Sequence, residues 1–236
     1  MAQPACRSSY YKLSLFQIYK ILLSHFGKQN WWPIDWEYHR EYNTDWRVEV
    51  ILGAILTQNT RWSNVEKALR ELKKNIRLDI WVLANIDEKY LSTLIKPVSF
   101  YNIKSSRIKS FFRYILENYE NLDKFFRKDV KKLREELLSL EGIGDETADV
   151  IILYAAEKPS FVVDSYTKRV FTRLGFLKGN EKYEEIKKLF EKNLPKDVEI
   201  YKEYHALIDV LAKTCCTKVP KCKECPLSKI RCKLRN

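Results

Sequence analysis

The sequence predicts an all-α protein, on three observations. Apolar residues recur at intervals of three and four along most of the chain, which is the period of a helix with one buried face. Two such stretches are separated only by a short glycine turn at 141–144. The one strand-like segment, Phe161 to Val163, is too short to build a sheet. Helices packed on helices are therefore the expected architecture.

The helical period places the elements in order along the chain. The first runs from Leu15 to Phe26 and ends at Gly27, because its apolar residues share one face. The stretch from Lys28 to Asp45 is rich in aromatic residues without a period and is expected to be a loop. Further helices are expected at Trp46 to Gln58, Asn64 to Lys74, Glu88 to Ile95, Ile108 to Tyr119, Val130 to Leu140, Glu146 to Ala156, from the cap Asp164 to Leu174, Tyr183 to Phe190 and Tyr204 to Ala212.

Composition excludes several classes of protein. The 236 residues are 45% hydrophobic, which is enough for a core and excludes a disordered chain, and six glycines and seven prolines exclude a low-complexity one. The longest apolar runs, Val50 to Leu56 and Val150 to Ala156, are far shorter than the about twenty residues of a membrane span. The first twenty-five residues hold no signal-peptide core. A soluble protein of the cytoplasm, without a membrane partner, is expected.

The charge and the glycine turn point to a phosphate-bearing partner. With 43 Lys and Arg against 31 Asp and Glu, the formal charge is +12, which reflects either solvated helix faces or a polyanionic partner. Gly142 and Gly144 lie directly before a predicted helix N-terminus, whose unpaired N–H groups and dipole favour an anion. A plain helical hairpin would need the same glycines, but in a basic chain a nucleic-acid phosphate is the natural ligand.

Several motifs together resemble one family. The run from Leu140 to Ala148 (LEGIGDETA), followed by Phe161 to Asp164 (FVVD) and Arg169 to Phe171 (RVF), resembles the helix-hairpin-helix glycosylases of the endonuclease III superfamily. Ile55 to Thr60 and Lys96 to Lys104 agree with it, so the resemblance covers about residues 46–232. It implies an all-α, two-lobed fold. One lobe would comprise residues 28–140 and continue into the hairpin at about 131–156, and the other residues 1–27 with 157–236.

The resemblance also assigns residues to double-stranded DNA. Gln58 would enter the gap left by an extruded nucleotide and bond to the orphaned base, although it could instead cap or end a buried helix. DNA would bind between the lobes, with the hairpin on a phosphate. The implied DNA-binding residues are Gln58, Asn59, Gly142, Ile143, Gly144, Glu146, Thr147, Lys168 and Arg169.

The implied catalytic residue is Asp164. A carboxylate beside an extruded nucleotide can stabilise the positive charge that develops on the sugar, or deprotonate an attacking water; as an Asp before a helix, Asp164 would also be a cap. Bifunctional members carry a lysine two residues after the second turn glycine, where this sequence has Glu146. Because a carboxylate cannot form a Schiff base, we expect a monofunctional enzyme. Lys104 and Lys168 are possible substitutes that nothing in the spacing favours.

Aromatic residues indicate the base that is removed. Trp31 to Pro33 and Thr57 to Trp62 resemble the 3-methyladenine glycosylase branch, in which the matching residues line the base pocket. The implied pocket residues are Trp32, Pro33, Trp62 and Glu146. Electron-rich indoles favour a cationic, alkylated purine, although any one tryptophan could be ordinary core.

Four cysteines near the C-terminus predict a metal centre. Cys215, Cys222, Cys225 and Cys232 are separated by six, two and six residues, which suits one zinc ion or an iron–sulfur cluster. The resemblance favours a [4Fe-4S] cluster over zinc in the loop 215–232, with a final interval one residue longer than usual at 226–231. Residues 213–236 hold eight Lys or Arg and one acid, so this loop would lie on the DNA backbone. Cys216 is an alternative first ligand, but Cys215 matches the spacing of the family, so Cys6 and Cys216 are expected to be free thiols.

The sequence therefore predicts a glycosylase that hydrolyses the bond to a 3-methyladenine-like base and that acts as a monomer on duplex DNA. Three alternatives stay open at this point. The protein could be a bifunctional glycosylase and lyase for oxidised pyrimidines, or a glycosylase for thymine or uracil opposite guanine. It could also bind damaged DNA without chemistry. His205 is expected to be a packing residue.

Overall fold

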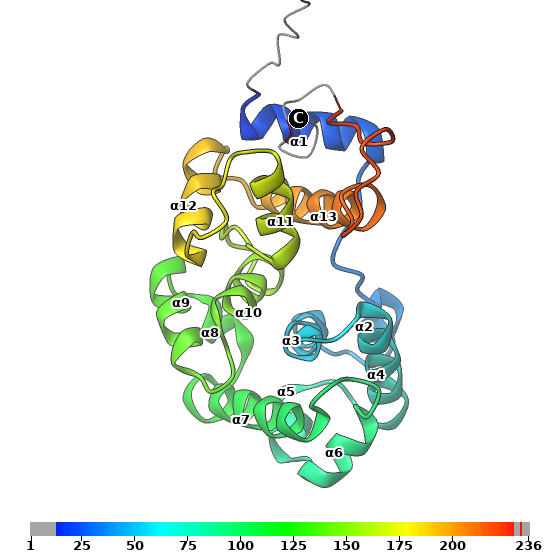
Figure 1. The fold of residues 1–236 in the computed structure, drawn as a ribbon. Helices are drawn as coiled ribbons and strands as arrows, with labels where there is room; N and C mark the ends of the chain where they lie inside the picture. Colours follow the sequence, from blue (N-terminus) through cyan, green and yellow to red (C-terminus); the bar gives the residue numbers. More distant parts are fainter. Residues whose placement is uncertain (1–12, 229–231, 233–236) are drawn as a thin grey trace, which may run out of the picture. The chain divides into compact units, whose positions relative to one another are not determined.

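The computed structural model describes residues 13–228 and residue 232. All regular structure in these residues is helical, which confirms the predicted all-α class (Figure 1). The chain divides into two compact units, one of residues 32–160 and one of residues 1–31 with 161–236. None of the helices in the described part has the length and apolar character that crossing a membrane requires.

The unit of residues 32–160 is built around one buried helix, α3 (Trp46–Thr57). All its residues from Val48 to Leu56 are buried, and Figure 1 shows α3 end on with other helices around it. This burial explains its nearly continuous apolar sequence, since each face meets a neighbour. The other helices are α2 (Trp36–Glu41), α4 (Trp62–Asn75), α5 (Ile80–Asn85), α6 (Glu88–Leu94), α7 (Tyr101–Tyr119), α8 (Leu122–Phe126), α9 (Val130–Ser139) and α10 (Asp145–Val150), the last followed by a π-helix, η1 (Ile151–Ala155).

The structure corrects the prediction that residues 28–45 form only a loop. They contain α2, whose N-cap Asp35 accepts a hydrogen bond from the backbone N–H of Tyr38. A helix of six residues is too short to show a period, so the cap was its only signal. The short helices α5 and α8, also absent from the prediction, are likewise capped, by Asp79 and Asn121.

Two predicted helices, α7 and α13 (Val198–Thr214), begin at least six residues earlier than expected. α7 begins at Tyr101 and not at Ile108. The prediction misses its first turns because they bury the polar residues Lys104 and Ser105, which interrupt the apolar period. In the other unit, α13 begins six residues before the expected start. Its N-cap is Asp197, which accepts from the N–H of Ile200. Prediction from the apolar period fails where the buried face of a helix carries polar residues, because those positions do not count as apolar.

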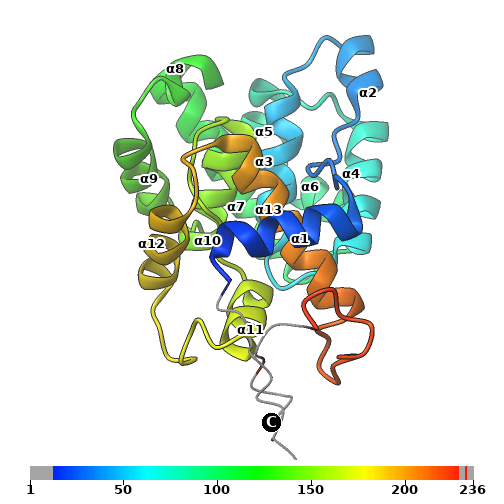
Figure 2. The same cartoon turned by 90° about the horizontal axis from the view of Figure 1, so that it is seen from above.

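The second unit has an aromatic core. Its helices are α1 (Leu15–Phe26), α11 (Ser165–Arg173), α12 (Tyr183–Asn193) and α13, and α1 lies across α13 (Figure 2). Phe190 stacks on Phe161 with ring centroids 4.3 Å apart and meets the edge of Phe171 at 4.7 Å. The buried hydroxyl of Tyr204 donates to the carbonyl of Leu15 at 2.9 Å, which ties α13 to α1.

The strand-like segment Phe161 to Val163 is buried and forms no strand in the described residues. Its backbone is satisfied by side chains: the N–H of Phe161 donates to Glu191, and that of Val163 to the hydroxyl of Tyr183.

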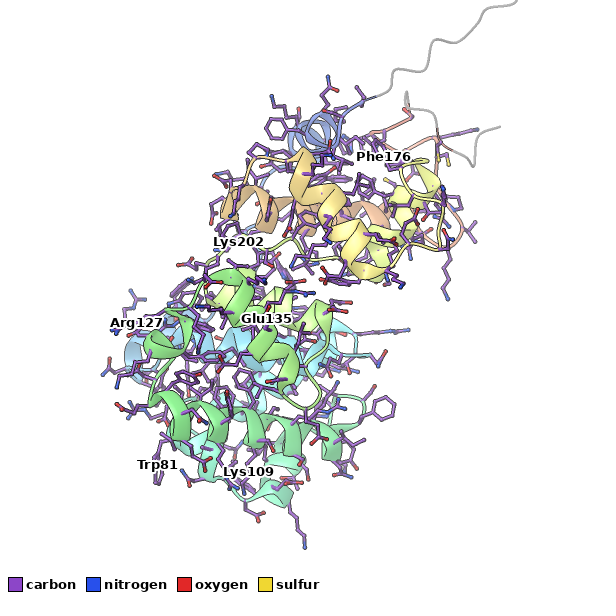
Figure 3. The ribbon with its side chains drawn as sticks, turned by 90° about the vertical axis from the view of Figure 1, so that its left-hand side faces the viewer. Trp81, Lys109, Arg127, Glu135, Phe176 and Lys202 are labelled. Carbon is purple, nitrogen blue, oxygen red and sulfur yellow. The ribbon has the colours of Figure 1, made fainter. Side chains whose placement is uncertain are left out.

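Aromatic residues are not confined to the interior, since Trp81 projects from α5 on the outside of the first unit (Figure 3).

Candidate active site and nucleic-acid interface

The predicted helix-hairpin-helix is formed by α9, the turn 140–144 and α10. Gly142 has φ +79°, in the left-handed region, and a Cβ there would lie 2.2 Å from Nε of Arg107. Glycine suits this position, because the left-handed backbone strains other residues and a Cβ would displace the side chain of Arg107. Gly144 is the N-cap of α10, with extended backbone. Ile143 between them is buried and anchors the turn from within.

Charged side chains hold the two helices of the hairpin together. Arg134 of α9 donates to Asp145 at 2.8 Å and to the buried carboxylate of Asp149 at 3.0 Å. Glu146 is exposed in the first turn of α10, where the helix dipole stabilises a carboxylate. The position that the resemblance assigns to a Schiff-base lysine is thus accessible but holds no amine.

Gln58, at the end of α3, is bonded to the hairpin. Its Nε2 donates to the carbonyl of Gly142 and to Oγ1 of Thr147, both at 2.9 Å. Its Oε1 accepts from Nη1 of Arg107 at 3.2 Å. The structure therefore brings together three of the predicted DNA-binding residues, Gln58, Gly142 and Thr147. In the protein without DNA, the Gln58 amide is engaged inside the protein.

Lys104 is a structural residue and not an available nucleophile. Its side chain is 1% exposed, and Nζ donates to the carbonyls of Leu56 and Gln58 at 2.7 and 2.6 Å and to Oγ1 of Thr60 at 2.9 Å. Burial lowers the pKa of Lys104 to about 8, with a smaller contribution from the charge of Arg107. The ammonium caps the carbonyl end of α3. Asn59, which follows Gln58 in the turn after α3, is exposed and has a positive φ of +52°.

The two predicted pocket tryptophans are in contact. The rings of Trp32 and Trp62 meet edge to face, with centroids 5.2 Å apart and planes at 88°. Tyr154, in the π-helix η1, lies 5.3 Å from Trp32. A Cβ on Gly53 of α3 would lie 2.6 Å from Cζ2 of Trp32, so the indole rests directly on the helix backbone.

Pro33, the third predicted pocket residue, follows Trp32 and is exposed. Tyr154 and Gly53 were not predicted as site residues. Tyr154 is 2% exposed and lies in a helix with an apolar sequence, so its pattern is that of ordinary core. The π-helix itself is a signal of functional sites, but it is visible only in the structure.

Asp164 is the N-cap of α11. Its Oδ1 accepts hydrogen bonds from the backbone N–H of Thr167 at 2.6 Å and from Oγ1 of the same residue at 2.7 Å. The cap does not use Oδ2, from which Nε2 of His205 is 4.0 Å away. The side chain of Asp164 is 14% exposed. His205 was expected to have no role, and the structure places it beside the predicted catalytic carboxylate.

The two predicted DNA-binding residues of α11 have different surroundings. Lys168 is exposed. Arg169 donates to the carbonyls of Ala212 at 2.9 Å and Cys216 at 3.0 Å, so its guanidinium fastens the end of α13 and the cysteine loop. Arg173, one turn further, donates to the carbonyls of Cys216 and Thr217 at 3.1 and 2.6 Å. The geometry assigns Arg169 an internal role, and its contact with DNA stays a prediction.

The four predicted metal ligands line a single cavity. Cys215, Cys222, Cys225 and Cys232 all face it, and Val170, Leu174, Leu211 and Leu227 supply apolar walls. None of the described cysteines is in a disulfide. In the described residues no three His, Cys, Asp or Glu side chains form a group that could hold one metal ion. Four thiols around an apolar cavity are a donor set that fits an iron–sulfur cluster.

Cys216 lines the same cavity but is set apart by its contact with Arg173, whose Nη1 lies 3.3 Å from Sγ. Cys6 and residues 229–231 of the predicted longer turn lie outside the described residues.

Phe100 is a candidate that the sequence did not reveal. It is the N-cap of α7, has φ +56° and is 64% exposed. A bulky residue in the left-handed conformation is strained, and strain of this kind gathers at functional sites. The amide of the preceding Ser99 donates to Oγ1 of Thr60, which joins this segment to the turn that follows α3.

Comparison with known proteins decides the family. Residues 52–196 match the HhH-GPD superfamily base excision DNA repair proteins. This chain belongs to that superfamily. A Methanocaldococcus jannaschii protein, provisionally named a DNA repair glycosylase, is 51% identical over 90% of this chain and 93% of its own length. Endonuclease III of Sulfolobus acidocaldarius is 30% identical over 74% of this chain and 77% of its own.

A solved structure agrees. The H. pylori 3-methyladenine DNA glycosylase MagIII, bound to 1,N6-ethenoadenine, superimposes with a TM-score of 0.71 and 30% identity, over 85% of this chain and 98% of that one. The helix-hairpin-helix resemblance is confirmed, and this HhH-GPD protein is an enzyme that acts on N-glycosyl bonds of DNA.

Proposed function

We propose that this protein is a monofunctional DNA glycosylase that removes an alkylated purine of the 3-methyladenine kind from duplex DNA and so begins base excision repair. It would act as a monomer, on DNA in the cytoplasm. The observation that carries the substrate class is the perpendicular pair of Trp32 and Trp62, seated on Gly53 and backed by Tyr154.

The aromatic cluster suits a cationic base for an electrostatic reason. An indole face is electron-rich, and it attracts a positive ring more strongly than a neutral one of the same shape. A purine methylated on a ring nitrogen carries that charge while it is attached to the sugar. Because the rings stand at 88° to each other, a base that stacked on one indole would meet the edge of the other, so shape and charge would select the base together.

Asp164 would supply the carboxylate for hydrolysis. As the glycosidic bond breaks, its electron pair leaves with the base, which becomes neutral, and positive charge develops on the sugar. Oδ1 is fixed by Thr167, and this leaves Oδ2 to stabilise that charge or to accept the proton of the water that bonds to the sugar carbon. His205, 4.0 Å from Oδ2, would orient the carboxylate.

Glu146 supports hydrolysis over lyase chemistry. No amine is present at the turn position, and Lys104 is held by three oxygen acceptors. Without a Schiff base the sugar stays intact after the base has left, so the DNA strand is not cut.

We also propose that Cys215, Cys222, Cys225 and Cys232, which line one cavity, hold a [4Fe-4S] cluster, and the likeness to endonuclease III favours this cluster over zinc. Bound there, the cluster would cross-link the loop. The exposed Lys218, Lys221 and Lys223 would then present a fixed positive surface to the DNA backbone.

Chromatography of the bases released from methylated duplex DNA tests the proposal, with strand integrity checked on the same sample. Release of 3-methyladenine from unbroken strands is the expected result. A borohydride trap should give no covalent complex between protein and DNA. Trapping together with nicks at oxidised pyrimidines, or release of thymine or uracil opposite guanine alone, would contradict the proposal.

A further inference from the structure

Gln58 is held at both its main chain and its side chain. Lys104 holds its carbonyl at 2.6 Å, while the side-chain amide reaches the hairpin turn at Gly142 and the first full turn of α10 at Thr147. The two partners of Nε2 are 84 and 89 residues away in sequence. A single side chain therefore connects the end of α3 to the helix-hairpin-helix.

The amide makes all the bonds that this connection needs. Both hydrogens of Nε2 are used, one on the carbonyl of Gly142 and one on Oγ1 of Thr147. Arg107 donates to Oε1 at 3.2 Å, which fixes the orientation of the amide, because a flipped amide would place two donors face to face. The same Arg107 packs against Gly142, where a Cβ would lie 2.2 Å from Nε.

We propose that Gln58 is a positioning residue that locks the hairpin turn to the end of α3, and that Arg107 sets the orientation of its amide. The lock keeps the turn in one shape before DNA arrives, so that its backbone N–H groups need no rearrangement to meet a phosphate. This role differs from the filling of a gap in the duplex, for which the amide would first have to break three hydrogen bonds.

The two roles predict different defects. A residue that only fills the gap matters after the nucleotide is extruded, so its loss slows base release and leaves binding of undamaged duplex unchanged. A residue that locks the turn matters for every duplex. Its loss should weaken binding of damaged and undamaged DNA by the same factor.

The experiment compares Gln58→Ala, Arg107→Met and the double variant with the wild-type holoprotein. The readouts are Kd for an undamaged duplex, and amide hydrogen exchange of residues 141–147 without DNA. We expect Gln58→Ala to weaken duplex binding about fivefold to tenfold, the usual effect of one or two lost hydrogen bonds, and to speed exchange in the turn. Arg107→Met should do the same to a smaller extent and add nothing in the Gln58→Ala background.

Three control variants complete the design. Arg107→Lys keeps a donor and should restore most of the affinity. Thr147→Val removes one acceptor at nearly constant shape and should give part of the Gln58→Ala effect. Arg113→Met removes the same charge from an exposed site on α7 and should leave exchange in the turn unchanged.

Unchanged exchange and unchanged duplex binding in Gln58→Ala would overturn the proposal. Additive effects of Gln58→Ala and Arg107→Met would overturn the part assigned to Arg107, because they would show that it contacts DNA itself. The proposal rests on duplex binding, which belongs to the proposed function. A wild-type protein that binds no duplex would contradict that function, whereas hydrogen exchange without DNA would still decide whether the lock exists.

Discussion

Among single residues, Gly53 has the most direct effect on the shape of the proposed base site. The helix interior around it is fully buried, and glycine is a poor helix former, so helix propensity does not explain its presence. The contact with Trp32 does: the indole occupies the space of a Cβ. Replacing this one hydrogen by a methyl group would displace the ring on which the proposed stacking depends.

Gly53→Ala should therefore slow single-turnover base release. The increase in the activation free energy of release should exceed the decrease in the free energy of unfolding. The overpacked methyl group should cost about 1–3 kcal/mol of unfolding free energy, measured by urea unfolding. For the unfolding free energy alone, Gly144→Ala is the control, since a Cβ there meets no atom within 4 Å and its φ is not positive. A Gly53→Ala protein that releases bases at the wild-type rate would show that Trp32 does not contact the base.

Phe100 is the second residue with a distinctive expectation. Its left-handed backbone costs stability, and its exposed ring gains nothing by burial in the free protein. Phe100→Gly should raise the unfolding free energy, by up to about 1 kcal/mol, while it weakens duplex binding. Thermal melting and the Kd for duplex DNA, measured on the same samples, check that stability rises while affinity falls. A fall in stability with unchanged DNA binding would assign the ring to packing.

The sequence predicted some site residues and not others, for physical reasons. Asp164, Gln58 and the hairpin glycines occur in short contiguous motifs, which a single sequence displays. Tyr154 and Arg107 act through contacts with residues far along the chain, and neither has a local pattern that differs from core or surface. Residues of this kind can be identified only once the structure is known.

At the scale of elements, α2, α3 and α4 are joined by a buried charge cluster. Glu49 of α3 is 2% exposed and accepts from Nε2 of His39 at 2.8 Å, from Nζ of Lys73 at 2.9 Å and from the backbone N–H of Asp35 at 3.1 Å. Burial alone would raise the pKa of Glu49, but the hydrogen bonds from His39 and Lys73 outweigh it and leave the pKa lowered. Lys73 also bonds Asp35 at 2.8 Å.

This cluster predicts a loss of stability in acid. Because the folded protein lowers the pKa of Glu49 below the ordinary 4.5, the unfolded chain takes up a proton more readily. The stabilisation is complete above that value and is lost as the pH falls through the folded pKa. Urea midpoints measured between about pH 6 and pH 3 should decline less steeply in Glu49→Gln than in the wild type. Parallel slopes would contradict the assignment.

The proposed cluster in the cysteine loop can be tested by measuring the metal and sulfide content of the protein. Iron and acid-labile sulfide should be present in equal amounts in the purified protein and should fall sharply in Cys222→Ser. Cys216→Ser is the matched control and should keep both, because Arg173 engages that thiol. Zinc in place of iron, or loss of iron from Cys216→Ser with retention in Cys215→Ser, would contradict the proposed ligand set.

Element boundaries followed the strength of their local signals. Long amphipathic helices such as α4 and α12 were predicted close to their observed bounds, since half of each surface meets solvent. The short helix α2 and the early start of α7 were missed, because caps and buried polar residues carry little periodicity.

At the scale of the whole molecule, the charge of +12 and the family agree on a DNA substrate. The positive charge should make duplex affinity fall with added salt, whichever base is removed. Substrate choice and chemistry must come from side chains, which the proposal places on Trp32, Trp62 and Asp164.

The most direct test of hydrolysis by Asp164 is single-turnover base release from a duplex with one 3-methyladenine, by the wild type and by Asp164→Asn at equal DNA occupancy. Asparagine keeps the cap oxygen and removes the charge. We expect the wild type to release the base from an uncut strand, and Asp164→Asn to bind equally well but to react at least about a hundredfold more slowly. Equal rates in the two proteins would contradict the catalytic role of Asp164, and no release by the wild type would contradict the proposed substrate.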